Sequence, residues 1–229
     1  MKVFSLLFML PSLGFAIQPG FYGDWNIGVS SGPSSAQAVG GAFVGSGGTI
    51  IGDVSELYGL TTRGSFGGSV DVGYNIIPNI GIEANYTYWG QQNVSTITGE
   101  FMTVMRGMNG LLYSQSVGGN LVAYFPLDQE KFNLYAKLGV AALFSTFKVD
   151  DPNSLVFLFP GSYSQNSAEP ALTYGLGLQY QFNPHASLLL AWSGISQFKD
   201  TPISNLHYNI GSIGLRYTFP NQAPSVYQK

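Results

Sequence analysis

The sequence predicts an all-β protein, an eight-stranded antiparallel transmembrane β-barrel with short periplasmic turns and long extracellular loops. Apolar residues alternate with polar or small residues in eight segments, the pattern of strands whose two faces meet different solvents. Only 9% of the residues are charged, against about 25% in soluble domains. The connections between the segments alternate between short and long, which is typical of outer-membrane barrels.

The eight strands are predicted one by one from this alternation. They span residues 21–30, 65–74, 80–89, 113–125, 132–144, 172–182, 188–192 and 212–219. The first strand sets Trp25 and Ile27 on one face and Asp24 and Asn26 on the other. The next five strands and the eighth repeat the contrast. The seventh is the weakest, because Leu189 falls on the face that should be polar or small.

Short connections are expected at 75–79, 126–131 and 183–185, and long ones at 31–62, 90–110, 145–170 and 194–205. Short turns face the periplasm in outer-membrane barrels and long loops face outward. The long loops carry apolar groups at 42–44, 50–51, 57–58 and 155–160. We expect these groups to fold onto the barrel mouth or into its lumen, or to contact a partner.

Residues 1–16 form a predicted signal peptide. Lys2 precedes a mostly apolar run, and Gly14 and Ala16 supply small residues before a cleavage site. The run is shorter than the roughly 20 residues that a membrane-spanning helix needs. The sequence therefore predicts export through the Sec pathway, a barrel over 17–219 and a short periplasmic tail over 220–229.

Composition excludes several classes of function. The chain of 229 residues has no cysteine, which excludes thiolate metal sites, disulfides and cysteine nucleophiles. Its net charge of −3 gives no basic surface for nucleic acid. The sequence contains no group of residues with the spacing of metal ligands. The glycine-rich residues 45–48 lack the lysine of a phosphate-binding loop. We therefore predict no cofactor and no metal.

A soluble barrel with a ligand inside would point its apolar face inward. Here every charge in a predicted strand lies on the polar face, and the apolar face carries none. These charges are Asp24, Asp71, Glu83, Lys137 and Arg216. Aromatic residues gather at both ends of the apolar face, as they do at the two interfaces of a bilayer. The apolar face is therefore predicted to meet lipid, and the polar face to line the lumen.

Three segments, residues 81–90, 132–139 and 174–182, resemble the outer-membrane β-barrel domain of the OmpA-like and opacity-protein superfamily. The resemblance covers roughly residues 20–219. It implies a monomer in the bacterial outer membrane, surrounded by lipid and lipopolysaccharide. Ser212, Gly214, Tyr217 and Phe219 also resemble the last-strand signal recognised by the barrel-assembly machinery, although Phe219 is not the terminal residue. The tail is too short for the peptidoglycan-binding domain of full-length OmpA-like proteins.

The interior of eight strands is a space that side chains can just fill. Tyr22, Trp89, Tyr124 and Tyr135 are expected to occupy it, opposite lumenal glycines. The five charges are expected in the periplasmic half, with Asp24 paired to Arg216 because the first and last strands adjoin on closure. The cluster is then either a structural polar plug or the gate of a narrow ion path.

Histidines are the remaining residues that could carry catalysis. His185 is expected in a periplasmic turn. His207 begins the last strand on the lipid-facing side, a place similar to that of the His-x-Ser pair of lipid A deacylases, but Asn209 stands where the serine would be. No catalytic residue is predicted. The sequence thus favours a non-enzymatic surface or structural barrel whose loops contact a host or matrix ligand. A narrow porin-like channel is the first alternative, and a lipid A- or phospholipid-modifying enzyme is the second.

Overall fold

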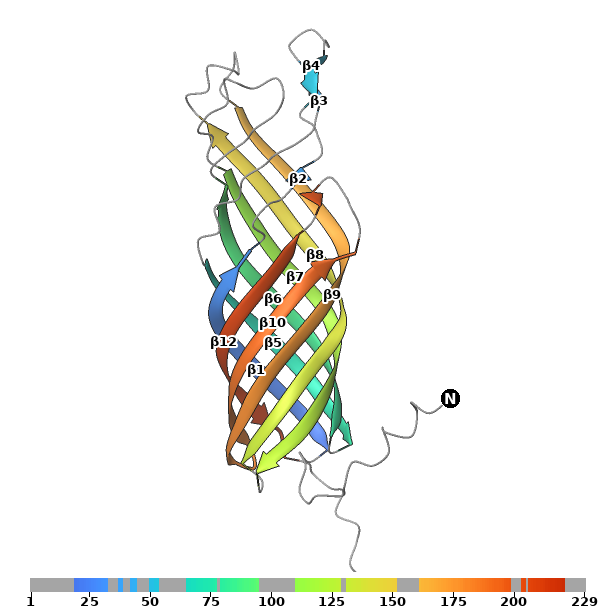
Figure 1. Ribbon diagram of the computed structural model, residues 1–229, viewed down its shortest axis with the longest axis vertical. Coiled ribbons are helices and arrows are strands. Elements are labelled where there is room, and N and C mark those ends of the chain that lie inside the picture. The colour runs from blue at the N-terminus through green and yellow to red at the C-terminus, as the bar shows by residue number, and fades with distance from the viewer. Residues whose placement is uncertain are drawn as a thin grey trace, which may run out of the picture.

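The computed structural model describes residues 19–32, 37–38, 42–44, 50–53, 65–77, 79–94, 110–128, 131–151, 161–198, 203–204 and 206–220. Eight strands close into one antiparallel barrel (Figure 1), which confirms the predicted fold class. They are β1 (Gly20–Ser31), β5 (Ser65–Ile77), β6 (Ile80–Val94), β7 (Gly110–Asp128), β8 (Phe132–Asp151), β9 (Gly161–Asn183), β10 (Ala186–Gln197) and β12 (His207–Thr218). The predicted signal peptide and residues 221–229 of the predicted tail lie outside the described residues. Among the described residues no helix is long and apolar enough to cross a membrane.

The barrel closes where β1 pairs with both β5 and β12. Going around the wall, each strand is hydrogen-bonded to its neighbours in chain order. We call the end where β1 begins and β12 ends the turn end. There, brief connections join β5 to β6, β7 to β8 and β9 to β10. The opposite end is the loop end.

The two faces of the wall are as different as the sequence predicts. Outward side chains are large, apolar and exposed, such as Ile27 at 73% and Phe66 at 86%. Inward side chains of the same strands are buried, and many are polar or charged, such as Asp24 and Ser30 at 0%. Leu189, the exception in the sequence pattern, points inward and is fully buried.

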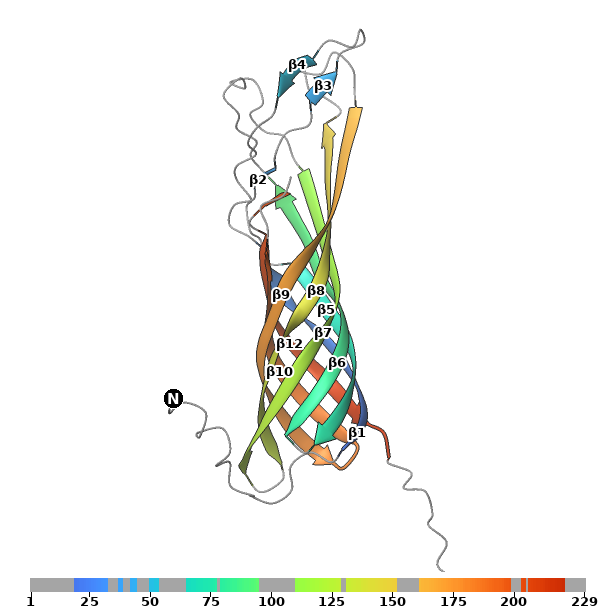
Figure 2. The same ribbon diagram turned by 90° about the vertical axis from the view of Figure 1, so that its right-hand side faces the viewer.

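The strands extend farther toward the loop end than predicted. The predicted loop over 145–170 is wrong for most of its length, because β8 and β9 stay paired from Ser145–Ser167 to Asp151–Gly161. Figure 2 shows these two strands rising beyond the start of β12 at the loop end. In the sequence of β8 the apolar residues Phe147 and Val149 have the opposite parity to Phe144, so the lipid-facing period-two pattern stops at Phe144 although the backbone ladder continues.

The predicted loop over 31–62 also contains short strands. β3 (Ala42–Val44) pairs with β4 (Ile50–Asp53), and these strands hold two of the apolar groups expected in that loop. β2 (Gln37–Ala38) pairs with β11 (Ile203–Ser204). Part of the first connection between barrel strands therefore has regular structure of its own.

β6 has a bulge next to Trp89, whose indole lies in the lumen as the alternation predicts. The register with β7 shifts between Tyr88 and Gly90, and Gly90 has a φ of +88°, which favours glycine. As a result, the consecutive residues Trp89 and Gly90 are both buried. The Trp89 indole donates a hydrogen bond to Ser116 at 2.9 Å.

Large side chains and glycines fit together across the lumen. Tyr22, Trp89, Tyr124 and Tyr135 are each at most 2% exposed. A Cβ added at Gly177 would lie 2.3 Å from Cζ of Tyr135, and one at Gly73 would lie 2.1 Å from Cζ of Tyr22. The two tyrosines therefore require glycine opposite them.

Gly177→Val should destabilise the barrel by about 1–3 kcal/mol, because the new side chain overpacks against the Tyr135 ring. Equilibrium unfolding in urea of protein refolded into detergent would measure the change. Gly211→Val is the control, since a Cβ there meets nothing within 4 Å. Equal stability of both variants would contradict the packing described here.

Candidate functional site in the barrel lumen

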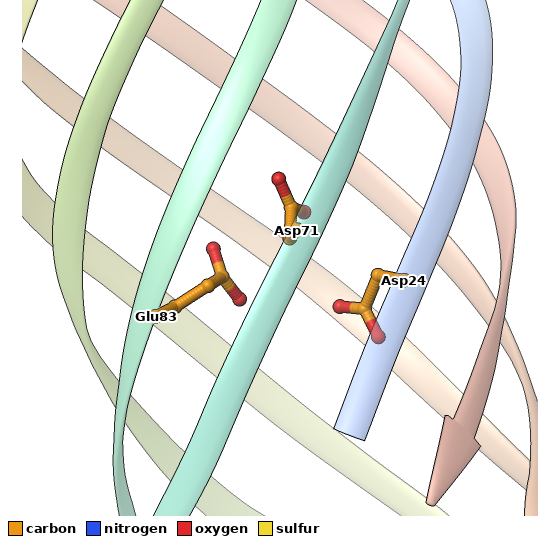
Figure 3. Close-up of side chains that lie close together, drawn as sticks. All are labelled: Asp24, Asp71 and Glu83. Atoms are coloured by element: carbon orange, nitrogen blue, oxygen red, sulfur yellow. The ribbon is translucent and has the colours of Figure 1, made fainter. Parts of the chain in front are cut away.

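The structure brings all five predicted lumenal charges together near the turn end. Asp24 lies on β1, Asp71 on β5, Glu83 on β6, Lys137 on β8 and Arg216 on β12. Each residue is on an inward position of its strand, and Asp24 is the direct cross-strand partner of both Asp71 and Arg216. Figure 3 shows the three carboxylates converging from neighbouring strands, and each offers an oxygen within 4.8 Å of the others.

Arg216 forms the pair with Asp24 that the sequence analysis expected. Its Nε and Nη2 each donate to one Asp24 oxygen at 2.7 Å, a bidentate geometry. Nη1 donates to the Tyr124 hydroxyl at 2.8 Å and to the Gln179 side-chain oxygen at 3.3 Å. The guanidinium also lies 4.0 Å from the centre of the Tyr22 ring. Arg216 is 2% exposed, so these contacts replace water around its charge.

Lys137 is shared among all three carboxylates. Its Nζ lies 2.8 Å from both oxygens of Glu83, 3.2 Å from Asp71 and 4.0 Å from Asp24. The ammonium therefore sits where a metal ion would be held by these acids. Asn120 donates a further hydrogen bond to Glu83 at 3.1 Å. Because burying a charge is costly unless it is paired, this network stabilises the charges in one arrangement.

Several partners of the network did not follow from the sequence. Alternation places Asn26, Asn120 and Gln179 on the inward face, but it does not tell which of them contact a charge. The contacts of Arg216 with Tyr124 and Gln179 cross the lumen between strands that are not adjacent. Only the cross-strand pair with Asp24 follows from closure of the barrel.

A small cavity lies beside the network on its loop-end side. Its volume is about 30 Å³, room for roughly two water molecules. Asp71, Glu83 and Asn85 are among its lining residues. Farther toward the loop end, a second buried cluster fills the lumen, in which Ser114 bonds Ser145 at 3.0 Å and Tyr208 at 2.7 Å. Side chains thus fill the lumen on both sides of the cavity.

The residues of the predicted assembly signal divide between the two faces of β12. Ser212 and Gly214 point inward, whereas Tyr217 and Phe219 are exposed, with ring centres 5.2 Å apart. The Phe219 backbone N–H donates to the carbonyl of Phe21, so the pairing continues past the end of β12. Recognition by the barrel-assembly machinery stays a prediction.

The two histidines lie at opposite ends of the barrel. His185 is in the turn before β10, and its Nδ1 lies 3.0 Å from the Thr218 carbonyl oxygen. His207 is exposed at the start of β12, where its cross-strand partner is Ser196. The predicted loop over 194–205 is wrong at its start, because β10 continues to Gln197, and Ser196 therefore was not expected beside His207.

Comparison with known proteins identifies the family. Residues 13–219 match the family model described as the outer membrane protein beta-barrel domain. The chain belongs to this family. It is therefore a protein of the bacterial outer membrane, whose outward face meets lipid, and in such barrels the turn end faces the periplasm.

Solved structures share the fold. Neisserial surface protein A is 16% identical, with a TM-score of 0.54 over 87% of this chain and 97% of its own. The outer membrane protein OprG from Pseudomonas aeruginosa is 14% identical, with a TM-score of 0.52 over 89% of this chain and 99% of its own. No curated protein sequence matches the chain significantly.

Arg216→Met should lower the free energy of unfolding by about 3–5 kcal/mol, because it leaves Asp24 buried without its partner. Urea unfolding in lipid vesicles would measure the loss. The double variant Asp24→Asn, Arg216→Met should lose less than the sum of the two single variants.

Lys131→Met is the matched control for Arg216→Met, since Lys131 is exposed in the turn between β7 and β8. It should leave stability unchanged. An Arg216→Met barrel as stable as the parent protein would show that the network is not a structural plug.

Proposed function

We propose that the protein is a non-enzymatic surface protein of the outer membrane, with a closed lumen and with its contact surface at the loop end. The observation that carries the proposal is the paired extension of β8 and β9. It continues past the lipid-facing aromatic residues at the loop end of the barrel. Phe144 is one of these residues, and pairing continues for seven more residues of β8, from Ser145 to Asp151.

The extension is suited to water and not to hydrocarbon. Outward positions beyond Phe144 carry Thr146 and Lys148 on β8 and Asn166 on β9. The Lys148 ammonium lies 5.8 Å from the centre of the Tyr113 ring. A charged group therefore lies next to an aromatic side chain at the loop end of the lipid-facing surface. A stiff polar sheet and the adjoining loops, held above the membrane by a rigid barrel, form a surface for a host or matrix ligand.

The filled lumen supports the same proposal. Arg216, Tyr22, Tyr124 and Tyr135 occupy the lumen at the turn end, and each is at most 2% exposed. Contacts in the barrel interior therefore stabilise the wall. We assign ligand binding to the surface outside the barrel.

Attachment of expressing cells should be lost when the extension is removed. The variant deletes residues 146–166 and joins Ser145 to Ser167 through Asn-Gly, a pair that suits a two-residue hairpin turn. A second variant shortens the connection between β1 and β5. Both should still fold, because the register of the barrel wall below Ser145 is unchanged, and heat-modified mobility on gels would verify folding. Deletion of 221–229, which follow the last barrel strand in the sequence, is the control. Unaltered attachment by correctly folded variants would refute the proposal.

A narrow channel is the alternative that one observation favours, namely the polar cavity inside the lumen. We expect refolded protein in a planar bilayer to show no discrete conductance steps, because buried side chains fill the lumen on both sides of that cavity. Steps that change with Glu83→Gln or Lys137→Met would establish the channel instead.

We propose no catalytic role for His207. Ser196 lies directly opposite, the kind of neighbour a serine–histidine pair requires, but their side chains are not hydrogen-bonded to each other. Mass spectrometry of lipid A and phospholipids should show no difference between cells with the parent protein and cells with His207→Ala. A modification that depends on both His207 and Ser196 would favour the enzyme.

A further inference from the structure

The lumenal network contains one more acid than base. Among the described residues that meet there, the acids are Asp24, Asp71 and Glu83, and the bases are Lys137 and Arg216. If every group were ionised, three negative charges would face two positive ones inside the barrel. A buried charge without a partner of its own is costly. The cost is avoided if one of the three acids is neutral.

Two of the three acids are well paired as anions. Asp24 accepts two hydrogen bonds of 2.7 Å from the guanidinium of Arg216. Both oxygens of Glu83 lie 2.8 Å from the ammonium of Lys137, and one of them accepts a hydrogen bond from the Tyr22 hydroxyl at 3.2 Å. These contacts favour the charged form of both side chains.

Asp71 is the acid with the weakest pairing. Its Oδ2 lies 3.2 Å from the ammonium of Lys137, which is closer to Glu83, and accepts a bond of 3.3 Å from the amide of Asn26. Asp24 is its direct cross-strand partner on β1, and like charges that stand opposite each other destabilise a sheet. Asp71 is also only 3% exposed, so water does little to solvate a charge there. Of the three acids, Asp71 gains least from being ionised.

We propose that Asp71 holds a proton in the folded barrel at neutral pH. The network then contains two ionised acids and two bases, and it is balanced. The titratable side chains that surround Asp71 come from the strands packed around it, namely Tyr22 and Asp24 on β1, Glu83 on β6, Tyr135 and Lys137 on β8, and Arg216 on β12. Loss of the proton at alkaline pH places a second negative charge opposite Asp24. The proton is thus a pH-sensitive part of the plug.

The stability of the barrel should therefore fall as the pH rises. An aspartic acid in the unfolded chain ionises near pH 4, so above that pH the folded state binds one proton more than the unfolded state. The equilibrium constant for unfolding should then increase by up to about tenfold per pH unit, until Asp71 ionises in the folded state as well. Asp71→Asn resembles the neutral carboxyl, and it should lack this contribution.

Urea unfolding of the parent protein and of Asp71→Asn in lipid vesicles, from about pH 5 to about pH 9, would measure the difference. Taking the difference removes what the two histidines contribute, because both proteins contain them. At the alkaline end Asp71→Asn should be at least as stable as the parent protein. Glu169→Gln is the matched control, since Glu169 is partly exposed on β9 outside the network, and it should keep the pH dependence of the parent.

Infrared spectroscopy would detect the proton directly. At neutral pH the refolded parent protein should show the stretching band of a protonated carboxyl. The band should shift when the aspartate carboxyl carbons are labelled with ¹³C, and it should be absent from Asp71→Asn and present in Glu169→Gln. Should Asp71→Asn fail to fold, the label still decides, because exposed aspartates are ionised at neutral pH and Asp24 is bound to Arg216.

The proposal is wrong if the parent protein shows no such band. It is equally wrong if the aspartate label leaves the band unshifted, because the proton then belongs to a glutamate. Persistence of the band in Asp71→Asn, or the same pH dependence in that variant as in the parent, would also overturn it. None of these results bears on attachment through the loop end.

Discussion

Pairing of β1 with β12 is the interaction on which the rest of the structure depends. In hydrocarbon no water can satisfy a free backbone N–H or C=O, so a sheet with an open edge cannot stand in a membrane. The ladder from Tyr22–Thr218 to Ser31–Asn209 removes that edge by joining the first barrel strand to the last. Every side chain of the wall then points either to lipid or to the lumen, and this choice fixes the chemistry of both surfaces.

The lumenal network follows from closure. A charge on the lipid face near mid-bilayer costs about 2–4 kcal/mol, so the charges of the strands lie inside. Inside, the space is narrow enough for an arginine on β12 to reach a tyrosine on β7 and a glutamine on β9. Charges that could not remain alone in such a space are stabilised as a connected set. Contacts between strands on opposite sides of the barrel also oppose its collapse or shear.

The sequence predicted most of the wall and part of the site, for physical reasons. Alternation reports the contrast between lipid and lumen, so it found the faces of all eight strands and the inward positions of the five charges. Because the first and last strands adjoin when the barrel closes, the sequence also predicted the pair of Asp24 with Arg216. The lipid-facing alternation stops at Phe144, because Thr146 and Lys148 follow at the outward positions, and for that reason Ser145–Asp151 of β8 was assigned to a loop. Nor does it encode contacts across the lumen, which depend on strand tilt and side-chain reach, as with Lys137 and Glu83 on β8 and β6.

The β8–β9 extension shows that lipid and water place different requirements on the sequence of one strand pair. A two-stranded hairpin is only marginally stable by itself in water. Here the ladder begins inside the barrel, where Phe132 to Phe144 already fix the register with β9, and the extension adds pairs to an existing template. The first pairs of this hairpin therefore form within the membrane, and the extension does not have to nucleate by itself. The backbone pairing of the extension does not depend on an apolar outward face, since Thr146, Lys148 and Asn166 stand there. In the wall below, the requirement for an apolar outer face and a fitted lumen leaves far less freedom.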